Sequence, residues 1–141
     1  MNSSVASHAL FVALVVQFAA VSVSVRAAAA EEALTGDWAG VSLCVANHDP
    51  CRDEKALYHL TGPNERNLVK IVASKIVAGR EIVMGPPSDF QYDPEKKTLV
   101  LENQYGLFRF TVSGDKLEGT LTVPSGVLYR KISLKRVAKE R

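Results

Sequence analysis

From residue 54 to the C-terminus, the sequence is a series of short apolar runs separated by Gly, Pro, Asn and Asp. Regular punctuation of this kind is typical of strands joined by tight turns. Together with a first strand near Trp38, the runs predict an all-β domain of about eight or nine strands. The runs span residues 54–61, 67–77, 82–85, 90–93, 98–103, 106–113, 117–123 and 127–137.

Alternation within the runs predicts that one face of the sheet is buried. Phe108, Phe110 and Val112 share one side of their strand, while the residues between them are polar. The turns are short, so neighbouring strands must be antiparallel. A meander of this many strands protects its edges by closing on itself. We therefore expect an antiparallel up-and-down barrel, whose interior is filled by side chains or holds one small ligand.

Residues 65–78 leave two interpretations open. The segment is rich in Val and Ile, which favours a strand. The spacing of Leu68, Ile71 and Lys75 also fits one face of a helix, which would cover or plug the barrel.

The N-terminus has the pattern of a secretory signal peptide. Ala9 to Val25 is almost wholly apolar, and the small residues of VRAAAA follow it. We expect residues 1–30 to be removed on export to the periplasm or the cell exterior, with an uncleaved membrane anchor as the alternative. Residues 31–137 then form a single domain, and residues 138–141 form a basic tail. We expect no stable membrane insertion after cleavage.

The two cysteines, Cys44 and Cys51, both lie in the exported part of the chain. An even pair outside the cytoplasm is normally a disulfide, and the intervening loop contains residues that favour turns. The acidic and histidine residues of segment 48–54 have no known metal-ligand spacing. We expect a structural disulfide, no metal and no cofactor.

Gly36-x-Trp38, followed by an arginine late in the chain, resembles the signature of the calycins, which include lipocalins, fatty-acid-binding proteins and avidins. The resemblance implies that Trp38 packs at the closed end of the barrel, beneath an arginine of the last strand. Both Arg130 and Arg136 lie on the apolar face of that strand, and the sequence does not choose between them.

The first strand has an unusual pattern, because its apolar residues lie on the face opposite Trp38. Ala39, Val41 and Leu43 share that opposite face. Either a bulge near Gly40 changes the register, or small residues line the interior and leave space for a cavity.

A second resemblance is to a family of small exported bacterial proteins with no assigned activity, and it implies fold and localisation only. The residues that carry it are Trp38, Gly40, Cys44, CRDE at 51–54, KIV at 75–77, Met84, Gly85 and EGTLTVPSG at 118–126.

Several functional classes are disfavoured by the sequence. The 17 Lys and Arg nearly balance the 15 Asp and Glu, which gives no basis for nucleic-acid binding. The chain has no G-x-S-x-G, no H-E-x-x-H and no Gly-rich phosphate loop. We therefore predict no catalytic residues and do not expect an enzyme.

Two functions from different classes remain. The first is a binding protein, expected to be a monomer, that holds a small apolar or amphipathic ligand inside the barrel. The candidate ligand-binding residues are Trp38, Ser42, Phe108, Phe110, Leu121 and Arg130. The second is a protein-interaction module or inhibitor, with a filled barrel that binds a partner through loops 46–52 and 85–89. An open cavity favours the first function and a filled core favours the second.

Native mass spectrometry of the protein isolated from its host tests the processing predicted here. We expect a chain that begins at Glu31, with a mass lower by two hydrogen atoms than the reduced sequence because Cys44 and Cys51 are bridged. A chain that retains the segment 9–25 would contradict signal-peptide cleavage.

Overall fold

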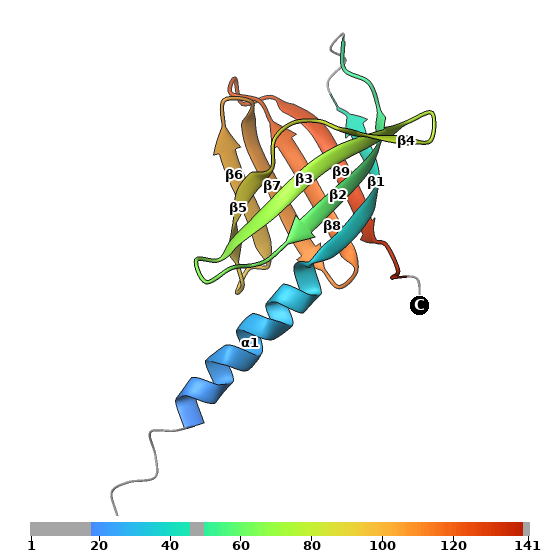
Figure 1. The fold of residues 1–141 in the computed structure, drawn as a ribbon. Helices are drawn as coiled ribbons and strands as arrows, with labels where there is room; N and C mark the ends of the chain where they lie inside the picture. The colour runs from blue at the N-terminus through green and yellow to red at the C-terminus, as the bar shows by residue number, and fades with distance from the viewer. Residues whose placement is uncertain (1–17, 46–49, 140–141) are drawn as a thin grey trace, which may run out of the picture.

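The protein is described by a computed structural model over residues 18–45 and 50–139. One helix, α1 (Phe18–Leu34), precedes nine strands (Figure 1). The strands are β1 (Gly36–Cys44), β2 (Glu54–Thr61), β3 (Leu68–Val77), β4 (Arg80–Val83), β5 (Ser88–Asp93), β6 (Thr98–Asn103), β7 (Gly106–Ser113), β8 (Lys116–Thr122) and β9 (Leu128–Arg136). Within the described residues, no helix is both long and apolar enough to cross a bilayer.

Eight of the strands form a closed antiparallel barrel, as the sequence predicts. The strand order is β2-β1-β9-β8-β7-β6-β5-β3, and pairing of β2 with β3 closes the ring. The strand β4 is not part of this ring. It pairs with the end of β3 from Ser74 to Val77, while β5 pairs with the beginning of β3. The strands therefore follow one another around the barrel in chain order, except for this one short hairpin.

Segment 68–77 is a strand, and the helical alternative is wrong. β3 pairs with β2 from Lys70 to Ile76 and with β4 and β5 on its other edge. These two sets of ladder hydrogen bonds, with Val69 and Ile71 buried in the core, outweigh the helical spacing of its apolar residues.

The closed end of the barrel is organised around Trp38, which is fully buried. Its indole Nε1 donates a hydrogen bond to the carbonyl of Leu34 at 3.1 Å. The guanidinium carbon of Arg136 lies 4.4 Å from the centre of the Trp38 ring, and Nη1 of Arg136 donates to the carbonyl of Thr35 at 2.9 Å. Arg136, and not Arg130, is thus the arginine stacked on the tryptophan.

The strand β1 contains no bulge near Gly40, because its register with β2 and β9 is continuous. Val41 and Leu43 lie on the outer face and are about two-fifths exposed. The small residues Gly40 and Ser42 point inward. A Cβ atom at Gly40 would overlap the carbonyl oxygen of Ser133, so only glycine permits β1 and β9 to approach this closely.

We expect Arg136→Ala to lower the free energy of unfolding by about 1–3 kcal/mol, because it removes the contact with Trp38 and the hydrogen bond to Thr35. Lys135→Ala, one residue away on the exposed outer face, is the matched control and should change it by less than about 0.5 kcal/mol. Urea denaturation of the two variants makes the comparison. Equal effects would mean that the stacked arginine does not hold this end together.

Candidate functional site

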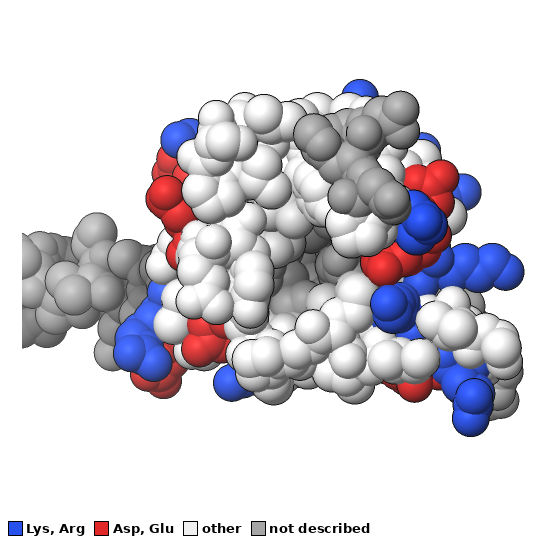
Figure 2. Space-filling view, turned by 90° about the horizontal axis from the view of Figure 1, so that it is seen from above, with Lys and Arg blue, Asp and Glu red and all other residues white. Residues whose placement is uncertain are grey.

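The barrel contains a cavity of about 490 Å³ at the end opposite α1. Figure 2 looks into this end and shows a hollow with uncharged residues around most of its rim and charged residues gathered on one side. The lining residues are Ser42, Glu54, Tyr58, Ile71, Ala73, Met84, Gly85, Pro86, Ser88, Phe90, Leu101, Asn103, Tyr105, Phe108, Phe110, Leu121, Arg130 and Ile132.

The cavity follows from the sizes of the inward-facing side chains. Trp38, Leu117 and Leu134 fill the closed half and are almost completely buried. Nearer the open end, the inward positions of β1 and β3 are occupied by the small residues Ser42 and Ala73. An eight-stranded barrel is only just wide enough to be filled by side chains, so small residues leave a space.

Aromatic side chains form a large part of the cavity wall. The Phe90 ring makes edge-to-face contacts with Phe108 and Phe110, with ring centres 6.2 and 5.8 Å apart. Tyr58 meets Phe110 in the same way at 6.2 Å. These mutual contacts hold the rings in place, so the apolar wall is preorganised.

Five of the six candidate ligand-binding residues line this cavity, namely Ser42, Phe108, Phe110, Leu121 and Arg130. Trp38 does not, because it is fully buried at the closed end. Glu54, Tyr58 and Phe90 also line the cavity, although they were not predicted from the sequence. Alternation along β2 and β5 predicts that these three residues face inward. Alternation does not show whether an inward-facing residue lines a cavity or belongs to a filled core.

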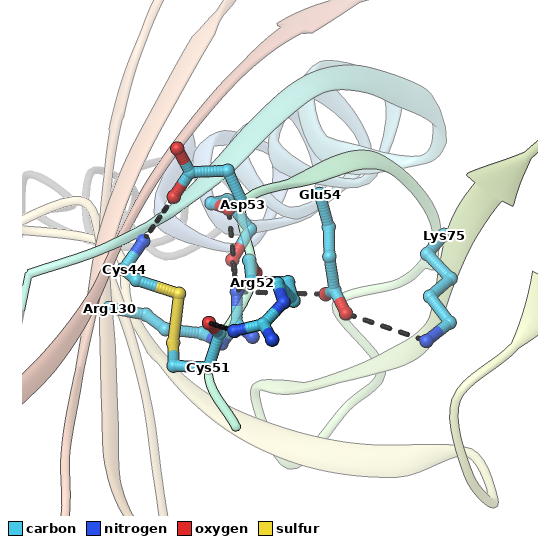
Figure 3. The surroundings of a disulfide bond; sticks show 8 residues. Cys44, Cys51, Arg52, Asp53, Glu54, Lys75 and Arg130 are labelled. Carbon is cyan, nitrogen blue, oxygen red and sulfur yellow. Dashed lines mark hydrogen bonds and ion pairs between the residues drawn. A yellow bond between two sulfur atoms is a disulfide. The ribbon is translucent and has the colours of Figure 1, made fainter. Parts of the chain in front are cut away.

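Arg130, on β9, lies at the mouth of the cavity, next to residues of the neighbouring strands β1 and β2 (Figure 3). Its Nη1 donates to the Ser42 hydroxyl at 3.2 Å, to the Ser42 carbonyl at 3.4 Å and to the Arg52 carbonyl at 3.0 Å. The same nitrogen lies 3.6 Å from a carboxylate oxygen of Glu54. These oxygens offset the cost of placing a charge on the inner face of a barrel.

The predicted disulfide between Cys44 and Cys51 is confirmed, and it lies beside Arg130 at the rim (Figure 3). Asp53 reinforces the bridge, because its carboxylate accepts a hydrogen bond from the backbone N–H of Cys44 at 2.8 Å. The disulfide therefore joins the end of β1 to the segment that carries the Arg52 carbonyl into contact with Arg130.

Burial raises the pKa of the Tyr58 hydroxyl to about 12, with a further contribution from the negative charge of Glu54 that the charge of Arg130 opposes. The phenol is therefore neutral near pH 7 and is able both to donate and to accept a hydrogen bond.

His59 lies on the outer face of β2, outside the cavity. Its Nδ1 is 2.7 Å from a carboxylate oxygen of Asp37, and its Nε2 is 2.6 Å from one of Glu81. Both hydrogen bonds raise the pKa of the imidazole, and the one to Asp37 has the larger effect. The sequence could not place a carboxylate beside this histidine, because Asp37 and Glu81 come from strands β1 and β4.

The remaining candidate positions are the two loops proposed for a protein partner, 46–52 and 85–89. Of the interaction loops, residues 46–49 lie outside the described residues, while Gly85 and Pro86 border the cavity. No group of three or more potential metal ligands occurs in the described part of the chain. A depression of about 670 Å³ near Glu32 and the segment 137–139 lies outside the barrel.

The sequence matches no protein-family model, and no curated protein shows significant similarity to it. The closed eight-stranded antiparallel barrel is compatible with a calycin-like fold.

We expect His59 to make stability depend on pH. Its raised folded-state pKa means that protonation stabilises the fold below the ordinary pKa of about 6.5, and that this stabilisation is lost as the pH rises through the folded value. Urea denaturation between about pH 5.5 and pH 8.5 should show wild-type protein exceeding His59→Gln in stability at the acidic end only. A difference independent of pH would contradict the ion-pair account.

Proposed function

We propose that the protein is an exported, non-catalytic binding protein that holds one small apolar or amphipathic molecule in the barrel cavity. The observation that carries the proposal is the cavity of about 490 Å³, open at one end and lined largely by aromatic and aliphatic side chains. Ligand pockets commonly have volumes of about 300–1,000 Å³, apolar walls and a few placed polar groups, and this cavity has all three.

The size of the cavity limits the size of the ligand. A water molecule occupies about 30 Å³ in the liquid, so a volume of about 490 Å³ accommodates on the order of fifteen non-hydrogen atoms. The ligand is thus a small molecule and not a macromolecular segment.

The alternative function, a filled barrel that binds a protein partner through its loops, is not favoured by a cavity of this size. Catalysis is also not favoured. Among the described residues, His59 is the only histidine. It lies on the outer face of the barrel between two carboxylates, away from the cavity.

Export is supported by two observations of different kinds. The segment 9–25 and the alanines that follow it have the pattern of a signal peptide. The disulfide between Cys44 and Cys51 is a bond that persists in oxidising compartments.

The neutral fluorophore N-phenyl-1-naphthylamine tests the proposed binding. We expect saturable fluorescence enhancement at one site per chain, and a dissociation constant at least about tenfold weaker in Ala73→Trp, because the indole would occupy the cavity. Val41→Trp adds the same side chain to the outer face and should bind within about twofold of wild type. Non-saturable binding, or equal affinities in the two variants, would refute the proposal.

A further inference from the structure

The cavity has two chemically different sides near its mouth. Ser42, Tyr58, Glu54 and Arg130 come from β1, β2 and β9, which are neighbours in the barrel. The facing strands β5, β6 and β7 contribute the apolar side chains of Phe90, Leu101, Phe108 and Phe110, together with the uncharged polar residues Ser88 and Asn103. The charged groups of the lining therefore lie on one side only.

The Arg130 guanidinium retains unused donors. All of its hydrogen bonds to described residues involve Nη1, although a guanidinium carries five N–H groups on three nitrogens. The side chain is only 15% exposed, and its hydrogen bonds to Ser42 and to the Arg52 carbonyl fix its position. Its remaining N–H groups are thus fixed at the cavity wall.

Glu54 retains unused acceptor capacity. One carboxylate oxygen lies 3.5 Å from Lys75 Nζ and the other 3.6 Å from Arg130 Nη1, which are long contacts for a carboxylate. The Glu54 side chain is 18% exposed, so water reaches it poorly. An ionised carboxylate accepts about four hydrogen bonds, so further donors would be accommodated.

Tyr58 is a third polar group with free capacity. The residue is 6% exposed and lines the cavity, and its hydroxyl makes no hydrogen bond to residues 18–45 and 50–139. A phenolic hydroxyl can both donate and accept a hydrogen bond. A ligand that brings a donor or an acceptor to this wall would satisfy it.

The charges on this wall select against a charged ligand group. Glu54 and Arg130 are the charged residues among those that line the cavity, and their charges cancel. A carboxylate placed here would approach Glu54, while an ammonium would approach Arg130 and also Lys75, which lies beside Glu54. Like charges at short range in a poorly solvated site repel strongly.

From this geometry we propose that the ligand carries an uncharged group with both a donor and an acceptor, such as a hydroxyl or a primary amide, against Tyr58, Glu54 and Arg130. The apolar body of the ligand then lies against the phenylalanine side. This inference rests on the proposed function, because it assigns the ligand class of the same cavity.

Displacement of N-phenyl-1-naphthylamine by ligands of one chain length tests the inference. The set is 1-decanol, decanoate, decylammonium and 1-chlorodecane, which lacks a hydrogen-bond donor. We expect 1-decanol to bind wild type at least about tenfold more tightly than each of the other three. Tighter binding of decanoate or decylammonium, or equal binding of 1-chlorodecane, would overturn the inference while leaving the proposed function in place.

Two variants locate the effect at the wall. Glu54→Gln leaves Arg130 uncompensated, so decanoate should bind at least about tenfold more tightly than it binds wild type. Tyr58→Phe should weaken 1-decanol several-fold without affecting 1-chlorodecane. Glu102→Gln removes a charge from an exposed position on β6 and should leave all four affinities unchanged. If both Glu54→Gln and Tyr58→Phe keep the wild-type preference for 1-decanol, the assignment of the polar group to this wall is refuted. If the wild-type protein does not bind the fluorophore at all, the proposed function is refuted as well.

Discussion

The barrel is closed only if β1 pairs on both edges, with β2 on one and with the last strand, β9, on the other, and the interior of the protein depends on that closure. It requires the backbones of β1 and β9 to approach at Gly40, where a Cβ atom would overlap the Ser133 carbonyl. Once the ring is closed, no edge of these strands remains unpaired, and every second residue points into a confined space. The contents of that space are then set by the sizes of the inward-facing side chains.

Those sizes differ between the two ends. At the closed end, the Arg136 guanidinium stacks on the Trp38 ring, and the indole N–H donates a hydrogen bond to the Leu34 carbonyl. The first strand, the last strand and the residue that ends α1 therefore meet at one point. At the open end, Ser42 and Ala73 leave volume unfilled. One barrel thus combines a densely packed base with an accessible cavity at its other end.

The disulfide and the charged residues at the rim form one connected arrangement (Figure 3). The bridge from Cys44 to Cys51 positions the chain so that the Arg52 carbonyl accepts a hydrogen bond from Arg130. Arg130 in turn lies beside Glu54 on the inner face. A short covalent loop therefore orients polar groups of the cavity, in addition to restricting the unfolded chain.

The sequence by itself determined the strands, the antiparallel barrel and the disulfide, because alternation and turn residues are local signals; β2, β6 and β7 have the same bounds as their apolar runs. It also placed Phe108, Phe110 and Arg130 on inward faces. Only the tertiary structure decided that Arg136 stacks on Trp38, that Glu54 and Tyr58 share the cavity with Arg130, and that His59 meets two carboxylates. Each of these contacts joins residues that are distant along the chain, and strand alternation gives the face of a residue but not its height in the barrel or its partner across it.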